Sequence, residues 1–211
     1  MTNFIPIFPL NIIVFPNEAL NLHIFEPRYK QLILECHQSK KPFGVPAVIN
    51  NSVQEYGSIV ELLEISKEYE NGELDIKTKG VRVFKILEII NELPDKLYSG
   101  AIVNYPANNE TTNRAAMQKI LFAVGELHNY LQVDKDFKKA SDKITVYDIA
   151  HHIGLSVEEE YELLKLMEER QRIEYVKRHL AKVIPMLADM EKLKEKIKLN
   201  GHFKNLSGLD L

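Results

Sequence analysis

The chain of 211 residues lacks several features that would place a protein directly in a class. It has one cysteine, Cys36, so no disulfide can form within the chain and nothing indicates an oxidising compartment. No apolar run approaches the roughly 20 residues that span a bilayer, and the apolar N-terminus has no basic leader. We therefore expect a cytoplasmic protein that does not bind a membrane.

An excess of positive charge and the common catalytic motifs are also missing. The formal net charge is −3 and neither half of the chain is basic, which disfavours nucleic acid as a partner. There is no Gly-Lys dipeptide, hence no GxxxxGK[ST] phosphate loop, and no GxSxG or HExxH motif. His151 and His152 are adjacent on a predicted helix, so their rings point in different directions. We expect no enzyme activity, no metal and no cofactor.

The chain up to about Pro106 has the pattern of short strands. Segments such as PLNIIVF, LNLHIF and FGVPAVI are apolar-rich and bounded by turn formers. His23, within the second segment, is expected to be a half-exposed strand residue. The turn at residues 70–72 predicts a hairpin, and Gly80 predicts a bulge or strand break. One helix is predicted from Pro27 to Gln38, and the whole pattern indicates a closed or half-closed β-barrel.

The second half of the chain has helical periodicity. The polar stretch 108–113 is the best boundary, so we predict a β subdomain over 1–106, a helical subdomain over 112–200 and a flexible tail over 201–211. Ser156 and Glu159 have the spacing of a capping box. Pro185 lies inside the last helical pattern and is expected to kink or break it.

The most informative segment is FPLNIIVFPNEALNLHIFEPRY, residues 8–29, in which prolines separate two strands from a helix. Glu26 and Arg28 flank Pro27 at the start of that helix. In a structural interpretation Glu26 caps the helix, or pairs with Arg28 or another basic residue. In a functional interpretation the pair lies on a recognition surface. We place the candidate protein-binding surface at Phe25, Glu26, Arg28 and Tyr29.

The order of these segments resembles the Lon protease substrate-binding (N-terminal) domain. The pairing of FPL with FEPRY carries the resemblance, together with FGV, YGSIVELLEI, KGVRVFKILEI and the helical segment IAHHIGLSVEEEYELLKLMEERQRIEYVKRHL. The family usually has Leu-Pro where this chain has Ile153-Gly154, a departure at a helix end. The resemblance implies an α+β fold with a PUA-like β pseudo-barrel followed by a C-terminal α-helical bundle.

The resemblance also implies a function. Full-length Lon proteases continue into an AAA+ ATPase and a Ser–Lys peptidase, whereas this chain is similar to the stand-alone Lon-domain proteins that lack both. The expected role is therefore a non-catalytic module that binds unfolded polypeptides or a partner protein. The alternatives are a PUA-like nucleic-acid binder, with Lys77, Lys79, Arg82 and Lys85 as candidate contacts, and an enzyme whose site is assembled from distant residues.

Overall fold

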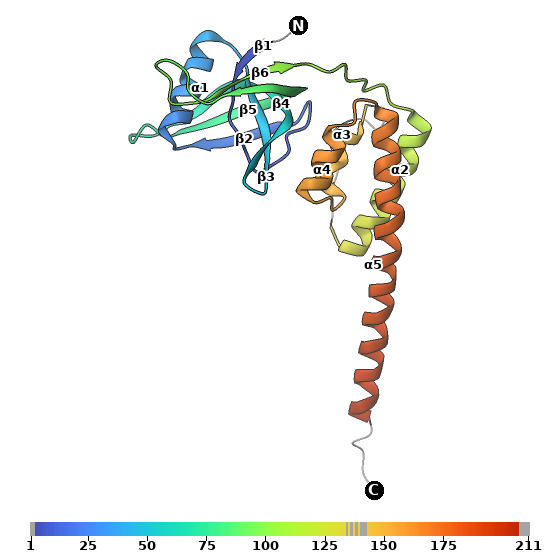
Figure 1. Cartoon of the computed structure of the whole chain (residues 1–211). Coiled ribbons are helices and arrows are strands. Elements are labelled where there is room, and N and C mark those ends of the chain that lie inside the picture. Colours follow the sequence, from blue (N-terminus) through green and yellow to red (C-terminus); the bar gives the residue numbers. More distant parts are fainter. Residues whose placement is uncertain (1–2, 134, 136, 138, 140–142, 207–211) are drawn as a thin grey trace. The chain divides into compact units, whose positions relative to one another are not determined.

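A computed structural model describes residues 3–133, 135, 137, 139 and 143–206 (Figure 1). The strands of this part are β1 (Asn3–Pro6), β2 (Ala19–Ile24), β3 (Phe43–Ile49), β4 (Ser52–Glu68), β5 (Leu74–Ile90) and β6 (Gly100–Asn104). The helices are α1 (Pro27–Ser39), α2 (Arg114–Leu131), α3 (Val146–Ile149), the short 3₁₀ helix η1 (Ala150–His152), α4 (Val157–Leu164) and α5 (Glu169–Leu206).

The strands form one antiparallel sheet in the order β1-β6-β5-β4-β3, with β2 paired to β5 outside this path. The long strands β4 and β5 are a hairpin whose turn contains Gly72 at φ 75°, as residues 70–72 predicted. The first half of β5 has β4 on one side and β2 on the other, because Leu74 pairs with both Glu68 and Ile24. The mixed α+β class with an antiparallel sheet is therefore confirmed.

The sheet is not closed into a barrel, so the expected pseudo-barrel is wrong in that respect. Between its edges the segment after β1 makes two isolated parallel bridges to β3, Ile7 to Gly44 and Leu10 to Ala47. A closed barrel needs a continuous ladder of donors and acceptors. The N–H groups of Phe8 and Leu10 donate to the carbonyls of Gly44 and Pro46, but Pro46 has no N–H to donate back, so the ladder is interrupted there.

The chain crosses β5 just before β2 begins, at a position where only glycine fits. The Gly80 N–H donates to the Glu18 carbonyl (2.8 Å), and the Asn17 N–H donates to the Gly80 carbonyl (2.9 Å). A Cβ atom on Gly80 would lie 2.2 Å from the carbonyl oxygen of Phe15. The β4–β5 register also shifts beside Gly80, so the predicted bulge is confirmed.

One apolar core attaches α1 to the sheet. The predicted stripe of the helix is buried, and it packs with residues of several strands, including Phe8, Ile24, Phe43 and Ile76. The stripe consists of Tyr29, Leu32, Ile33 and Cys36. Burial raises the pKa of the Cys36 thiol to about 11, so the thiol stays protonated and unreactive at neutral pH.

Two compact units are distinguished by contacts, Met1–Thr111 with Tyr147–Glu169, and Thr112–Val146 with Arg170–Leu211. The first unit thus includes η1 and α4, which the sequence grouped with the other helices. The division into subdomains 1–106 and 112–200 stays a prediction about which parts of the chain fold independently. Local interactions tie the inserted segment to the strands: the backbone N–H of Tyr56 donates to Tyr161 Oη (3.2 Å), and the Phe15 ring stacks on Tyr147 at 5.2 Å.

The helices differ from the sequence expectation mainly near the C-terminus. The capping box of Ser156 and Glu159 at the start of α4 is confirmed. Pro185 lies inside α5, which continues unbroken to Leu206. The first residues of the expected tail are therefore helical, while 207–211 lie outside the described residues. None of the helices in the described ranges has an apolar stretch long enough to cross a membrane.

The crossing at Gly80 makes a prediction about stability. Gly80→Ala should lower the free energy of unfolding by about 1–3 kcal/mol, because the added methyl meets a backbone oxygen that cannot rotate away. Gly125→Ala, within α2, is the matched control. No heavy atom lies within 4 Å of its added methyl, so it should raise stability by about 0.5–1 kcal/mol. Urea unfolding of both variants tests this, and equal effects would contradict it.

Candidate functional site

Strand β2 ends at an exposed aromatic side chain. The residues of β2 alternate: Leu20 and Leu22 are partly buried against the core, whereas Asn21 and His23 are exposed. Phe25 follows the same alternation onto the exposed face, and 59% of its surface is accessible. Its ring stacks beside that of His23, with 6.3 Å between the centroids. A large apolar side chain is thus presented to solvent at the end of a well-fixed strand.

The neighbouring residues of the FEPRY segment have different environments. Glu26 precedes α1 but makes no side-chain cap bond, so the capping interpretation is wrong. It pairs instead with Arg28, whose Nη2 lies 2.7 Å from Glu26 Oε2. Pro27 is the first helical residue, as predicted. Tyr29 is 7% exposed and its ring stacks on that of Phe8 at 3.9 Å. The Arg28 guanidinium lies over the Tyr29 ring, 4.4 Å from its centroid.

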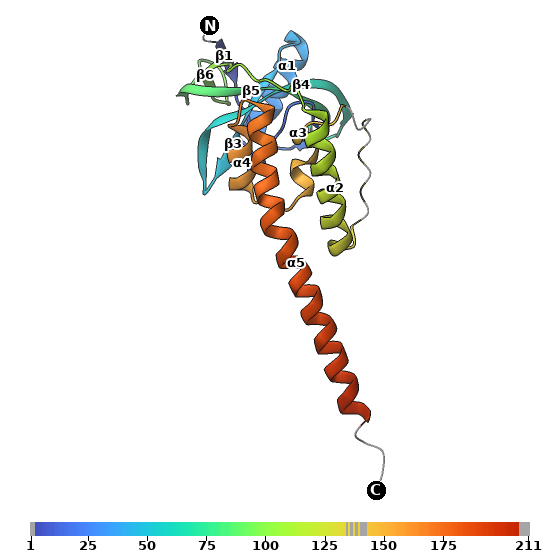
Figure 2. The ribbon, with the colours of Figure 1, turned by 90° about the vertical axis from the view of Figure 1, so that its right-hand side faces the viewer.

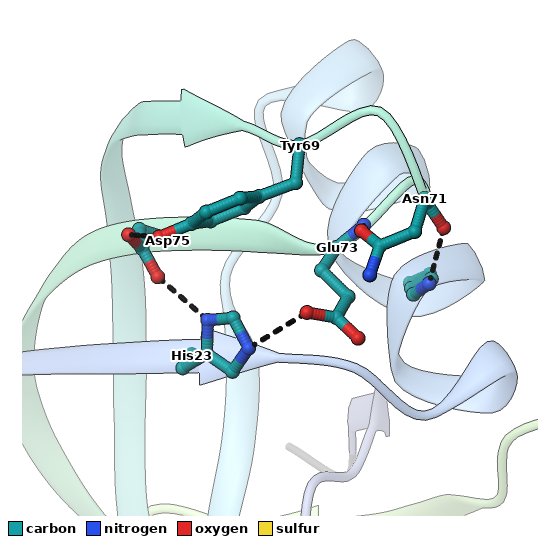
Figure 3. Close-up of polar contacts among 6 residues, drawn as sticks. His23, Tyr69, Asn71, Glu73 and Asp75 are labelled. Atoms are coloured by element: carbon teal, nitrogen blue, oxygen red, sulfur yellow. Dashed lines mark hydrogen bonds and ion pairs between the residues drawn. The ribbon is translucent and has the colours of Figure 1, made fainter.

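A cluster of polar side chains lies beside Phe25, and we refer to His23, Tyr69, Glu73 and Asp75 as the His23 cluster (Figure 3). His23 Nδ1 lies 2.7 Å from Asp75 Oδ1, and its Nε2 lies 3.1 Å from Glu73 Oε2. The Tyr69 hydroxyl donates to the other oxygen of Asp75 at 2.8 Å. The cluster therefore spans β2, the β4–β5 turn and the start of β5.

The electrostatics of the His23 cluster follow from this geometry. The hydrogen bond to Asp75 raises the pKa of His23 above its ordinary value, and Glu73 acts in the same direction. The hydrogen bond from His23 lowers the pKa of Asp75, and Tyr69 adds to this. With His23 protonated, two carboxylates face one imidazolium, and Lys67 Nζ lies over the Tyr69 ring at 4.1 Å, so the positive and negative charges are balanced here. In the part of the chain described, no cluster has three His, Cys, Asp or Glu side chains suitably placed for a metal.

No pattern in the sequence indicated this cluster. His23 is a partly exposed strand residue, as predicted, with a side chain 46% accessible. The partners are 50 and 52 residues away in the chain. The strand register, which sets His23 opposite Asp75, is the signal that brings them together. The cluster could have been predicted only if the pairing of β2 with β5 had been predicted correctly.

A second histidine cluster fixes the inserted helical segment to the sheet within the first unit. His151 Nδ1 lies 2.7 Å from Glu160 Oε1, and its Nε2 lies 3.2 Å from Glu18 Oε2. Glu18 also accepts the backbone N–H of Phe15 at 2.8 Å. Burial alone would lower the pKa of His151, but the bonds to Glu160 and Glu18 outweigh it and raise the pKa to about 10. From the sequence, His151 was recognised only as one of two adjacent histidines whose rings point in different directions.

An apolar groove lies in the second unit, between α2 and α5, which run side by side in Figures 1 and 2. Its volume is about 590 Å³. The lining consists mainly of small and aliphatic side chains, including Ala116, Ile120 and Ala123 of α2 and Ile173, Leu180 and Ile184 of α5. No catalytic constellation is present among these residues.

The candidate contacts for nucleic acid are occupied by neighbouring side chains. Lys77 pairs with Glu64 at 2.5 Å, and Lys85 pairs with Glu55 at 3.3 Å. The guanidinium of Arg82 lies over the Tyr105 ring at 3.7 Å. Lys79 lies opposite Glu61 in the β4–β5 ladder. The carboxylates offset the positive charge that a phosphate backbone would require, so nothing in this geometry supports the nucleic-acid alternative.

Known proteins are similar to this chain in sequence and in fold. The family model of the ATP-dependent protease La (LON) substrate-binding domain matches residues 5–182. The chain belongs to this family. Two solved structures share its fold. A Lon N-terminal domain protein from Xanthomonas campestris is 21% identical with a TM-score of 0.61, and the match covers 82% of this chain and 95% of that chain.

The second structure is the N-terminal domain of a Mycobacterium avium complex Lon protease. It is 12% identical with a TM-score of 0.62, and the match covers 85% of this chain and 98% of that chain. The resemblance identified from the sequence is therefore confirmed. The Lon family model describes a substrate-binding domain, not the catalytic one.

The His151 cluster predicts a pH dependence of stability. Because the folded-state pKa is raised from about 6.5 to about 10, the stabilisation is complete below pH 6.5 and is lost as the pH rises toward 10. Between pH 6.5 and 8.5 the free energy of unfolding should fall by up to about 1.4 kcal/mol per pH unit from this proton. His151→Gln should be less stable at pH 6.5 by about 1–3 kcal/mol and should lack this slope.

Urea unfolding at several pH values between 6 and 8.5 measures both effects. His37→Gln is the matched control, because it removes an exposed histidine of α1 and should leave the slope unchanged. A wild-type slope that survives in His151→Gln would show that other groups carry the pH dependence.

Proposed function

We propose that this chain is a non-catalytic module that binds unfolded polypeptide or an extended segment of a partner protein in the cytoplasm. The observation that carries the proposal is the exposed Phe25 ring at the end of β2, held between the His23 cluster and the Glu26–Arg28 pair. An apolar anchor surrounded by polar groups is the usual composition of a protein-recognition surface. The Lon family, as a substrate-binding domain, supports the same role.

The four residues named from the sequence have separate roles in this proposal. Phe25 supplies apolar contact, whereas Glu26 and Arg28 form the polar rim and orient the incoming chain. Tyr29 is buried, so its role is to hold the start of α1 on the core through the Phe8 ring. Exposed pairs such as Glu26–Arg28 contribute little to folding, on the order of 0.2–1 kcal/mol, which leaves them available for recognition.

The affinity should be weak. A flexible polypeptide loses conformational entropy when it is ordered on a small surface, so we expect a dissociation constant between about 1 μM and 1 mM. Binding should have a negative heat-capacity change, because apolar surface is buried, and little dependence on salt. We expect no hydrolysis of ATP or casein, since the sequence contains no Gly-Lys phosphate loop or other catalytic motif that we recognise.

Substitution of the anchor tests the proposal. Phe25→Ala should weaken binding of a reduced, unfolded polypeptide about fivefold or more, because the main apolar contact is removed. Phe122→Ala is the matched control: this ring is 72% exposed on α2, and its loss should change the dissociation constant less than twofold. Isothermal titration calorimetry measures both constants and the heat-capacity change.

The same titration with single-stranded RNA tests the alternative function. Tight RNA binding that collapses as salt rises would contradict the proposed function, because counterion release is the signature of phosphate contacts. A loss of polypeptide binding in Phe122→Ala, with Phe25→Ala unaffected, would contradict the location of the surface.

A further inference from the structure

Strand β2 is an open edge of the sheet. Within the part of the chain that the structure describes, it pairs with β5 and with no other strand. The other edge strands contain proline: β1 ends at Pro6, and β3 contains Pro46. The sequence of β2 is ALNLHI, with no proline, lysine, arginine, aspartate or glutamate. Proteins commonly protect edges with proline or charge, and this edge has neither within the strand.

The hydrogen-bond register shows which backbone groups of β2 face outward. The Gly80 N–H donates to the Glu18 carbonyl, and the bonding direction alternates along an antiparallel pair. Leu20, Leu22 and Ile24 therefore direct their N–H and C=O groups toward β5. Ala19, Asn21 and His23 direct theirs to the open edge. The edge offers three donors and three acceptors in a row.

The side chains beside this edge define what would pair with it. On the inner face, Leu20 and Leu22 are partly buried against the core, so an added strand would extend the apolar surface with its own apolar residues. On the outer face, the exposed side chains of Asn21 and His23 lie nearest the open edge, so polar residues of an added strand would lie beside them. Phe25 continues that face beyond the end of the strand.

We propose that an extended segment of another polypeptide adds to the open edge of β2 as a further strand of the sheet. Its apolar residues lie beside Leu20 and Leu22, and its polar residues lie beside Asn21 and His23 on the exposed face. This pairing rests on the proposed function and states how the Phe25 surface holds its ligand. Backbone hydrogen bonds to β2 supply affinity that does not depend on the peptide sequence. The alternating side chains supply the preference for some peptide sequences over others.

The experiment uses the full chain and a fluorescently labelled, capped nine-residue peptide in which valine alternates with lysine and threonine. Asn21→Pro removes an outward-facing N–H without removing a bond to β5. It should weaken peptide binding at least tenfold, measured by fluorescence anisotropy. Asn21→Ala is the matched control, since it keeps the N–H, and should bind within twofold of the wild type.

Modified peptides test the same contact from the other side, even if Asn21→Pro does not fold. Two versions of the peptide carry N-methyl groups on alternate residues, one on the valines and one on the residues between them. Because valine alternates with polar residues in the peptide, only one of its faces can be buried beside Leu20 and Leu22. A pairing with β2 that is shifted by one residue is therefore disfavoured. Only one version has its free N–H groups directed to β2, so one should keep its affinity and the other should lose it.

The outcomes separate the pairing from the proposed function. Wild-type affinity in folded Asn21→Pro, or equal affinities of both N-methylated peptides, would overturn the pairing. The proposed function would stand in that case if Phe25→Ala still weakened binding of unfolded polypeptide. Failure of the wild-type chain to bind either polypeptide or peptide would overturn both. Dimers that form through β2 and exclude the peptide would show that the occupant is a second copy, which also contradicts the pairing.

Discussion

The structure of the first unit depends on one close backbone contact, the crossing of residues 15–18 over β5 at Gly80. Because Gly80 has no side chain, the carbonyl of Phe15 can approach β5 and the Gly80 amide can bond to Glu18. This crossing sends the chain into β2 along the first half of β5. The position of the His23 cluster and of Phe25 follows from it, since both depend on the register of β2 against β5.

The same crossing holds the inserted helical segment. The carboxylate of Glu18 accepts the Phe15 amide and lies beside His151, which in turn contacts Glu160 of α4. A protonated imidazole between two carboxylates satisfies polar groups that would otherwise be costly to bury. Together with the Phe15–Tyr147 stacking and the Tyr56–Tyr161 hydrogen bond, this charged contact joins residues 147–169 to the strands.

Much of the fold could be predicted from the sequence, because local patterns determine it. The strands of the first half, the helix after Pro27, the turn at Gly72 and the capping box of Ser156 all follow from turn chemistry and periodicity. The open sheet could not be predicted, since the pairing of its edges depends on where Pro46 meets the segment after β1 in space. The course of α5 past Pro185 to Leu206 could not be predicted, since an interior proline usually kinks or ends a helix.

The candidate site was predictable only in part. The FEPRY segment indicated Phe25, Glu26, Arg28 and Tyr29, but burial separates the exposed Phe25 from the core residue Tyr29. The interpretation of Glu26 as a cap was wrong, because its carboxylate is engaged by Arg28. The two histidine clusters join residues 50 or more positions apart for His23, and 133 apart for His151 and Glu18. No short-range pattern encodes such pairs.

The central claim is that polypeptide is recognised on β2 and beside Phe25. Amide hydrogen exchange followed by NMR, with and without saturating unfolded polypeptide, tests it most directly. The account predicts that the amides of Ala19, Asn21 and His23 exchange rapidly in the free protein and slowly in the complex, while those of Leu20 and Leu22 are slow in both. Unchanged exchange at Ala19, Asn21 and His23 in a saturated complex, with new protection in the groove between α2 and α5, would contradict it.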